Sequence, residues 1–291
     1  IIHGGTLSRS LQSISSVVPS GRTMPILLNF LMEVENEELK ITASDLETTI
    51  TVKLNPSMLE QDQVNKIAIP AKMFLEVVNS LSSQQITVEV KENYSVEITA
   101  GTGRYKLVGE DPASYPTAIE LSDPALTTIS SSVLVKAIGK TLFATGTGEM
   151  RPQMTGVLCE QTHNETIFVA TDAHKLVKYT RTDCKNDEER SFILPKTPLS
   201  LLNKLLSSHK EEIMVNMENN NENVKFEFEN YTVVSRLIDG KYPNYNMAIP
   251  ENNPNKLIID RAMLFESVKR VALFANQVNN QVVFRLQDNE L

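Results

Sequence analysis

The side chains that could carry out catalysis are few in this chain, and they do not group along the sequence. Four histidines are present, none at metal-ligand spacing from a second ligand: His3, His163, His174 and His209. No H-E-x-x-H, G-x-S-x-G, Walker or G-x-G-x-x-G motif occurs. Cys159 and Cys184 have no second cysteine at a metal or redox spacing, so we expect ordinary thiols in a reducing setting. We therefore expect no catalytic residue, no metal and no cofactor.

Asp45 and Asp172 stand out because they recur at equivalent positions, 127 residues apart. A catalytic pair would place two carboxylates, or a carboxylate and a base, in one site. A single aspartate that follows a strand is instead typical of a side chain that caps a tight turn. We interpret both as turn-capping residues.

Two segments have the character of a binding surface. Residues 169–176 read as a strand that ends in a tight turn, followed by His174 and Lys175. Residues 237–245 contain aromatic and proline residues, with Met247 just beyond. Apolar segments that lead out of a domain often line ligand or peptide grooves. His174 allows two interpretations, a hydrogen-bonded structural histidine or a residue that contacts a partner.

Both segments belong to a repeat of domain length. Equivalent residues recur 127 positions apart: Pro25, Ala43 and Asp45 return as Pro152, Ala170 and Asp172, and Tyr115-Pro116 returns as Tyr242-Pro243. A period of this length is one domain, not one turn of a solenoid. The sequence predicts domains at 1–122, 123–249 and 250–291. We interpret the third as a truncated copy, with a strand at Ile258-Ile259, a helix and up to two further strands.

Each repeat contains two similar halves, and each half is predicted as a strand, a helix and three strands. Apolar spacing of three and four residues predicts helices near 6–18, 71–82, 131–144, 197–208 and 260–275. Alternating apolar residues predict strands near 26–35, 38–43, 48–54, 85–91, 95–100 and 104–109, with Asn36 in a turn. The fold class is therefore α+β, built from repeated β-α-β-β-β halves.

Charge is divided unevenly between these elements. The 291 residues carry a net charge of −8, which taken alone argues against nucleic-acid binding. The five predicted helices, however, hold eight basic and three acidic residues, so they carry +5 and the remainder carries −13. Chance is one explanation, since lysine and arginine form helices well. The other is a positive helical face that attracts a polyanion. No apolar run is long enough to span a membrane.

Several segments resemble the bacterial DNA polymerase III beta subunit family, the sliding clamps. The resemblance rests on 170–176 (Ala-Thr-Asp-Ala-His-Lys-Leu), 237–243 (Leu-Ile-Asp-Gly-Lys-Tyr-Pro), 23–27, 43–47, 69–72 and 194–196, in order along essentially the whole chain. It implies the DNA clamp fold, with helices on the inner face and antiparallel sheets outside. It also implies a non-catalytic processivity factor that encircles duplex DNA as a ring of two chains in the bacterial cytoplasm, at the replication fork.

The resemblance also implies partners and contact residues. The partners are double-stranded DNA without sequence preference, the polymerase III alpha subunit, the clamp loader and other proteins with a clamp-binding motif, and no membrane. DNA would meet helix and loop cations: Arg9, Arg22, Lys72, Lys136, Lys140, Arg151, Lys204 and Lys241. A partner peptide would dock in a groove formed by Met154, Thr171, Ala173, His174, Lys175, Leu176, Pro243 and Met247. Leu273 and Phe274 would lie in the homodimer interface.

The groove departs from the family pattern at four positions. Ala173 stands where glycine is common, Lys175 where arginine is common, and Pro152 and Gln153 replace the usual aromatic pair. Partner preference would differ accordingly. A second hypothesis is a repeat-domain scaffold that binds peptides and never encircles DNA. The positive helices favour the clamp, because a scaffold has no reason to keep acidic residues off five helices.

Overall fold

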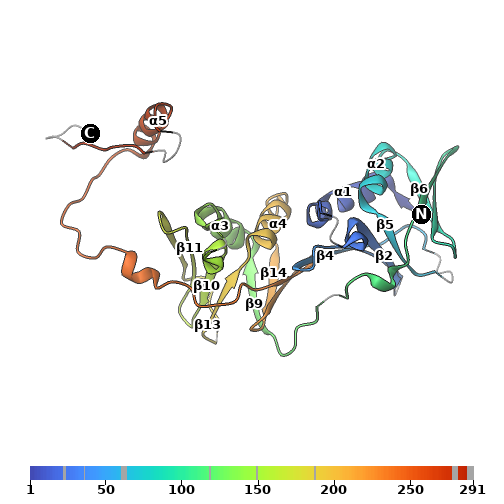
Figure 1. Cartoon of the computed structure of the whole chain (residues 1–291), viewed down its shortest axis with the longest axis horizontal. Coiled ribbons are helices and arrows are strands. Elements are labelled where there is room, and N and C mark those ends of the chain that lie inside the picture. The colour runs from blue at the N-terminus through green and yellow to red at the C-terminus, as the bar shows by residue number, and fades with distance from the viewer. Residues whose placement is uncertain are drawn as a thin grey trace. The chain divides into compact units, whose positions relative to one another are not determined.

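The computed structural model describes residues 1–21, 24–35, 37–59, 64–117, 119–148, 150–186, 188–276 and 281–286. The chain divides into two compact units, Ile1–Pro243 and Asn244–Leu291, shown in Figure 1. Arg22 and Asn36, which the sequence places in a DNA-facing loop and a turn, lie outside the described residues.

The first repeat follows the predicted order in both halves. Its first half comprises β1 (Ile2–His3), α1 (Gly4–Ile14), β2 (Asn29–Glu35), β3 (Glu38–Ser44) and β4 (Thr48–Leu54). Its second half comprises β5 (Lys66–Pro70), α2 (Ala71–Ser80), β6 (Gln85–Val90), β7 (Ser95–Ala100) and β8 (Gly103–Val108). Apolar spacing explains α1, because Leu7, Leu11 and Ile14 form one fully buried stripe.

The second repeat has the same order. It comprises β9 (Ala125–Ser130), α3 (Ser131–Thr141), β10 (Val157–Gln161), β11 (Thr166–Thr171) and β12 (Leu176–Arg181), then β13 (Arg190–Leu194), α4 (Lys196–Leu206), β14 (Met214–Asn219), β15 (Asn223–Phe228) and β16 (Tyr231–Arg236). Short 3-10 turns lie at Ser15–Val17, Pro25–Leu28, Pro112–Ser114, Leu142–Ala144 and Pro152–Thr155. The predicted fold of repeated β-α-β-β-β halves is confirmed.

The two halves of each repeat exchange their first strands. In the first repeat β1 joins the sheet β1-β6-β7-β8, whereas β5 pairs with β2 beside β3 and β4. In the second repeat β9 pairs with β14, and β13 pairs with β10. Each half therefore completes the sheet of the other. The paired helices also contact each other, and Gln12 of α1 donates a hydrogen bond to Asn79 of α2 at 2.9 Å.

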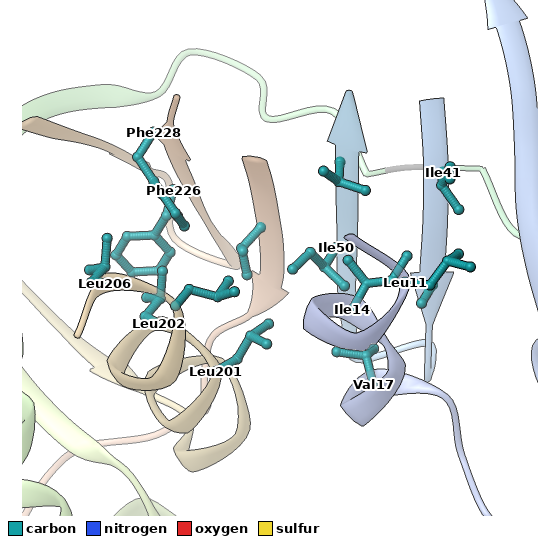
Figure 2. Packing of buried hydrophobic residues seen from close by; sticks show 14 of the residues in the cluster. Leu11, Ile14, Val17, Ile41, Ile50, Leu201, Leu202, Leu206, Phe226 and Phe228 are labelled. Atoms are coloured by element: carbon teal, nitrogen blue, oxygen red, sulfur yellow. The ribbon is translucent and has the colours of Figure 1, made fainter. Parts of the chain in front are cut away.

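One sheet runs through both repeats. It has eight strands in the order β5-β2-β3-β4-β16-β15-β14-β9, and the β4–β16 pair joins the repeats. We call this antiparallel pair the seam; its register places Val233 opposite Ile50 and Ser235 opposite Thr48. Figure 2 shows Leu11 and Ile14 near Ile50 on one side, with Leu202 of α4 near Phe226 on the other. One apolar cluster includes side chains from both repeats.

The four helices of the first unit lie along the same side of it in Figure 1. Each covers strands from its own repeat: α1 contacts β3 and β4, α2 contacts β2 and β5, α3 contacts β9, β11 and β12, and α4 contacts β16. Helices on one side and sheets on the other agree with the predicted layering.

The second unit contains α5 (Arg261–Ala272), which begins where Asp260 accepts a hydrogen bond from the Met263 N–H at 2.8 Å. The helix is as predicted, but the strand expected at Ile258-Ile259 is wrong: the described part of this unit contains no strand. The equivalent strand β9 pairs with β14, about 90 residues further along. A strand at this position therefore depends on pairing with a partner distant in the sequence, and its own residues do not determine it.

Candidate functional site

The helices of the first unit carry a strongly biased set of charges. Helices α1 to α4 contain a single acidic residue, Glu76, and six basic ones: Arg9, Lys72, Lys136, Lys140, Lys196 and Lys204. We call these six the helix cations. All six are exposed, and none is in an ion pair with a carboxylate in the part of the chain that the structure describes. Lys140 is 6.0 Å from the centre of the Tyr179 ring.

Basic residues on the strands behave differently. Most of them face nearby carboxylates, for example Lys40 with Glu35 at 2.5 Å and Lys66 with Glu33 at 2.8 Å. Other strand cations in ion pairs are Lys53, Arg104, Arg181, Arg190 and Lys225. Most of the positive charge on the strands is therefore neutralised, with Arg236 at the end of β16 as one exposed exception, whereas the helices leave theirs open to solvent. Two loop positions proposed for DNA contact, Arg151 and Lys241, are also exposed.

The turn after β11 is built by Asp172. Its Oδ1 accepts the backbone N–H groups of His174 and Lys175, both at 2.9 Å. The Lys175 ammonium pairs with the other carboxylate oxygen and, with these N–H groups, lowers the pKa of Asp172 far below its usual range. Asp45 repeats the arrangement and accepts the N–H of Thr48 at 2.7 Å. The turn-capping interpretation of both aspartates is confirmed.

The residue after each aspartate adopts a left-handed backbone. Ala173 has φ of 75° and Leu46 has φ of 79°. Side chains with a Cβ are uncommon in this region, and glycine adopts it without a steric penalty. The conformation turns the chain sharply and leaves Ala173, His174 and Lys175 exposed at the end of the strand.

Tyr242 braces this turn from a distant part of the sequence. Its hydroxyl accepts the N–H of Thr171 at 3.1 Å, and burial raises the pKa of its phenol. Gly240 makes the approach possible with φ of 113°, a conformation that other residues rarely adopt. Tyr115 is the equivalent in the first repeat, where it is buried and bonded to the backbone of Asn29 and Thr42.

The structure places five of the predicted groove residues on one turn. Thr171 is buried at the end of β11, Ala173, His174 and Lys175 form the turn, and Leu176 begins β12. Pro243 follows Tyr242 in the sequence. Met154 is buried and Leu176 is half-buried. Met247 belongs to the second unit and is 85% exposed.

His174 is exposed, and its ring forms no hydrogen bond with any residue that the structure describes. The interpretation of a hydrogen-bonded structural histidine is therefore wrong. Sequence reasoning did not assign Tyr242 or Lys196 a role. The 127-residue recurrence of Tyr-Pro was the signal that could have identified Tyr242.

Groups that would indicate other chemistry are lacking within the described ranges. No cluster of three His, Cys, Asp or Glu residues there could hold a metal ion. Cys159 and Cys184 are buried free thiols, and burial raises the pKa of both. None of the described helices has the length and apolar character to cross a membrane.

Known proteins resemble the chain over almost all of its length. Residues 1–119 match the N-terminal domain of the DNA polymerase III beta subunit, and residues 128–244 match its central domain. The beta sliding clamp of Staphylococcus aureus is 30% identical over 266 residues, which span 90% of this chain and 70% of that protein. The Staphylococcus epidermidis clamp is 30% identical over 274 residues, 92% of this chain and 72% of that protein.

Solved structures agree with the sequence matches. A sliding clamp from Pseudomonas aeruginosa, described as bound to griselimycin, superposes with a TM-score of 0.88 at 26% identity, covering 96% of this chain and 75% of that one. The Bacillus subtilis clamp superposes with a TM-score of 0.87 at 26% identity, covering 95% and 74%. Both the sequence and the fold place this chain in the DNA polymerase III beta subunit family, the beta sliding clamps of DNA replication.

Proposed function

We propose that five of the helix cations, all but Lys196, form the surface with which this sliding clamp follows duplex DNA, while the protein itself performs no catalysis. The observation that carries the proposal is the contrast between exposed, unpaired cations on the helices and ion-paired cations on the sheets. A ring that encloses DNA needs no tight DNA site. Weak phosphate contacts that carry no sequence information hold its orientation and permit sliding.

The proposed DNA contacts combine the helices with loops. They are Arg9, Lys72, Lys136, Lys140 and Lys204 on helices, and Arg22, Arg151 and Lys241 on loops. Arginine and lysine side chains of this kind contact phosphate oxygens through charge-assisted hydrogen bonds.

Ring formation is supported by the strand edges of the first unit. The seam joins β4 of one repeat to β16 of the next, and the equivalent strands β12 and β8 remain at sheet edges. We propose that a third domain pairs with β12 and that β8 receives the third domain of a second chain. Repeating one junction in this way gives a head-to-tail ring of two chains with three domains each, with boundaries near 122 and 249. Leu273 and Phe274, 80% and 91% exposed, are available for the contact between chains.

The braced turn is proposed as part of the partner groove. It would use Met154, Thr171, Ala173, His174, Lys175, Leu176, Pro243 and Met247 to hold a short peptide with apolar anchors. Partners of this kind are the polymerase III alpha subunit, the clamp loader and other proteins with a clamp-binding motif. With these partners, we propose that the protein works in the bacterial cytoplasm, at the replication fork.

Retention on circular DNA tests the clamp proposal. The test compares the 291 residues with a chain continued by the third domain of the Staphylococcus aureus relative, after loading onto nicked circles. We expect the continued chain to be a dimer by light scattering, to stay on circles through a high-salt wash, and to leave when a restriction enzyme opens the circle.

The alternative scaffold gives a different result. A monomer that binds circles and linear DNA equally, with strong salt dependence, would contradict the ring. Such a result would favour the peptide-binding scaffold.

A further inference from the structure

A pocket opens in the first unit where the two repeats meet. Its volume is about 420 Å³, and the residues that line it come from the turn after β3, the loop after α3, the start of α4 and the end of β16. They include Glu47, Thr147, Lys196, Thr197, Arg236 and Ile238. We call it the junction pocket.

Backbone contacts form the pocket in advance of any ligand. The Arg236 N–H donates to the Glu47 carbonyl at 2.9 Å, which ties the turn of the first repeat to β16. The Ile238 N–H donates to the Ile193 carbonyl at 3.0 Å. Because these contacts need no rearrangement, a ligand would find a largely preformed site.

The charges of the pocket favour an anion. Lys196 and Arg236 are exposed and form no ion pair with any carboxylate in the described ranges, and among the described lining residues Glu47 is the single acid. The first turn of α4 also faces the pocket through Thr197, and no side chain caps it. Uncapped N–H groups at a helix start add partial positive charge.

The floor of the pocket is apolar. Leu237 and Ile238 are half-buried there, so each still exposes part of its side chain to the pocket. A ligand that covers them gains from burying apolar surface. The backbone of duplex DNA presents no apolar group of this kind to cover Leu237 and Ile238. Anion and apolar contacts together therefore fit a protein segment.

The repeat gives an independent indication. Glu47 and Thr48 occupy in the first repeat the positions of His174 and Lys175 in the second, 127 residues later, each pair presented by an aspartate-capped turn. The turn of the first repeat meets the end of the next repeat at the junction pocket.

We propose that the junction pocket is a second docking site for partner proteins, which takes a short peptide with an apolar side chain next to carboxylates. Arg236 and Lys196 bind the carboxylates, and Ile238 receives the apolar side chain. The ligand bonds are charge-assisted hydrogen bonds from Arg236, Lys196 and the start of α4.

A fluorescein-labelled hexapeptide of alternating aspartate and leucine, with one leucine replaced by benzoyl-phenylalanine, tests the proposal on the full chain. We expect saturable binding by anisotropy, and photo-crosslinks that mass spectrometry assigns to the junction pocket. K196S/R236S should weaken binding roughly tenfold to a hundredfold, because it removes two charge-assisted bonds. T147W should weaken binding by filling the pocket without a change of charge.

The matched control is K185S/K210S, which removes two exposed lysines that do not line the pocket. It should change binding by less than about twofold. Circular dichroism checks that each variant folds. Absence of saturable binding, equal losses in the control, or crosslinks confined to 172–176 would overturn the proposal. Displacement of the peptide by a 20-base-pair duplex, with DNA binding that also requires Lys196 and Arg236, would identify a phosphate site instead.

Discussion

At the scale of single residues, two turns contain a residue whose backbone conformation is unusual for a side chain with a Cβ. Ala173 and Leu46 both hold a left-handed backbone, which costs a residue with a Cβ about 1 kcal/mol or more. The hydrogen bonds to Asp172 and Asp45 hold the turns in place despite this cost. The family resemblance had identified position 173 as one where glycine is common, and the backbone gives the physical reason.

Replacing Ala173 with glycine should therefore stabilise the protein. Relief of the left-handed strain outweighs the greater freedom of glycine in the unfolded chain, and we expect a gain of up to about 1 kcal/mol, read as a higher urea midpoint. Ala113→Gly is the control, because Ala113 is exposed in a 3-10 turn and is not among the residues with positive φ. It should lose stability. A loss of similar size in A173G would contradict the strain argument.

Tyr115 provides a prediction about pH. Burial raises the pKa of its phenol well above its ordinary value near 10, so the folded protein favours the neutral form. The associated stability is fully present below about pH 10 and is lost as pH rises from there toward the raised pKa. Urea unfolding between pH 8 and 11 should show a steeper alkaline loss in the wild type than in Y115F.

The substituted protein should also be about 1 kcal/mol less stable at pH 8, because Asn29 and Thr42 carbonyls lose a donor. Parallel pH curves for the two proteins would show that Tyr115 does not control the alkaline loss. The Y242F variant is a useful second case, since burial raises the pKa of Tyr242 as well.

At the scale of elements, local pattern predicts nearly every helix and strand. The buried stripe of α1 and the alternation in β3 and β4 are sufficient because each element packs one face on a core. The exchange of β1 and β5 between halves could not be predicted, since edge strands of similar composition are compatible with either sheet. The same limit applies to the strand at Ile258-Ile259, whose formation depends on a partner and not on its own residues.

The candidate site also has features that local sequence predicts and features that depend on contacts between distant segments. Local sequence was sufficient for the aspartate turns and for the bias of charge on the helices. It could not show that the helix cations lack ion pairs, because pairing depends on neighbouring strands. Nor could it show that Tyr242 reaches Thr171, a contact across 71 residues.

The seam is the element whose loss should affect both repeats. Ile50 is fully buried in β4, opposite Val233 of β16. Ile50→Ala leaves a cavity next to this pair, and we expect it to cost about 2–4 kcal/mol in urea unfolding. Protection of β16 amides against hydrogen exchange should fall together with that of β4.

Lys53→Ala is the control from the same strand, because Lys53 is exposed and its ion pair with Glu38 spans 3.9 Å. It should change stability by less than about 0.5 kcal/mol. If I50A loosened β4 and left β16 fully protected, the two repeats would be energetically independent.

At the scale of the whole molecule, the distribution of charge matters more for DNA binding than the net charge. The protein is an acidic chain with a net charge of −8, yet α1 to α4 hold six cations and one acid. Interactions with DNA phosphates fall off within about 8 Å at physiological salt. DNA enclosed by the helices would therefore meet the positive surface, and the acidic sheets would lie beyond the screening distance.

Removing four lysines from the helical surface, or four from the sheet surface, distinguishes the effect of charge position from the effect of net charge. K72S/K136S/K140S/K204S and K40S/K53S/K66S/K91S lower the net charge equally. We expect the helix variant to reduce the slope of log K against log salt for a duplex by roughly 3.6, since each of the four phosphate contacts contributes about 0.9. The sheet variant should leave the slope nearly unchanged. Equal effects would show that overall charge, and not the helical surface, governs DNA binding.

The seam also has a mechanical consequence. Five residue pairs between β4 and β16, with an apolar cluster that both repeats share, should make residues 1–243 resist bending between the two repeats. Deformation concentrates where a structure is most compliant. A loader that opens the ring would then move the first two domains as one rigid body. The bending would occur at the domain junctions outside residues 1–243.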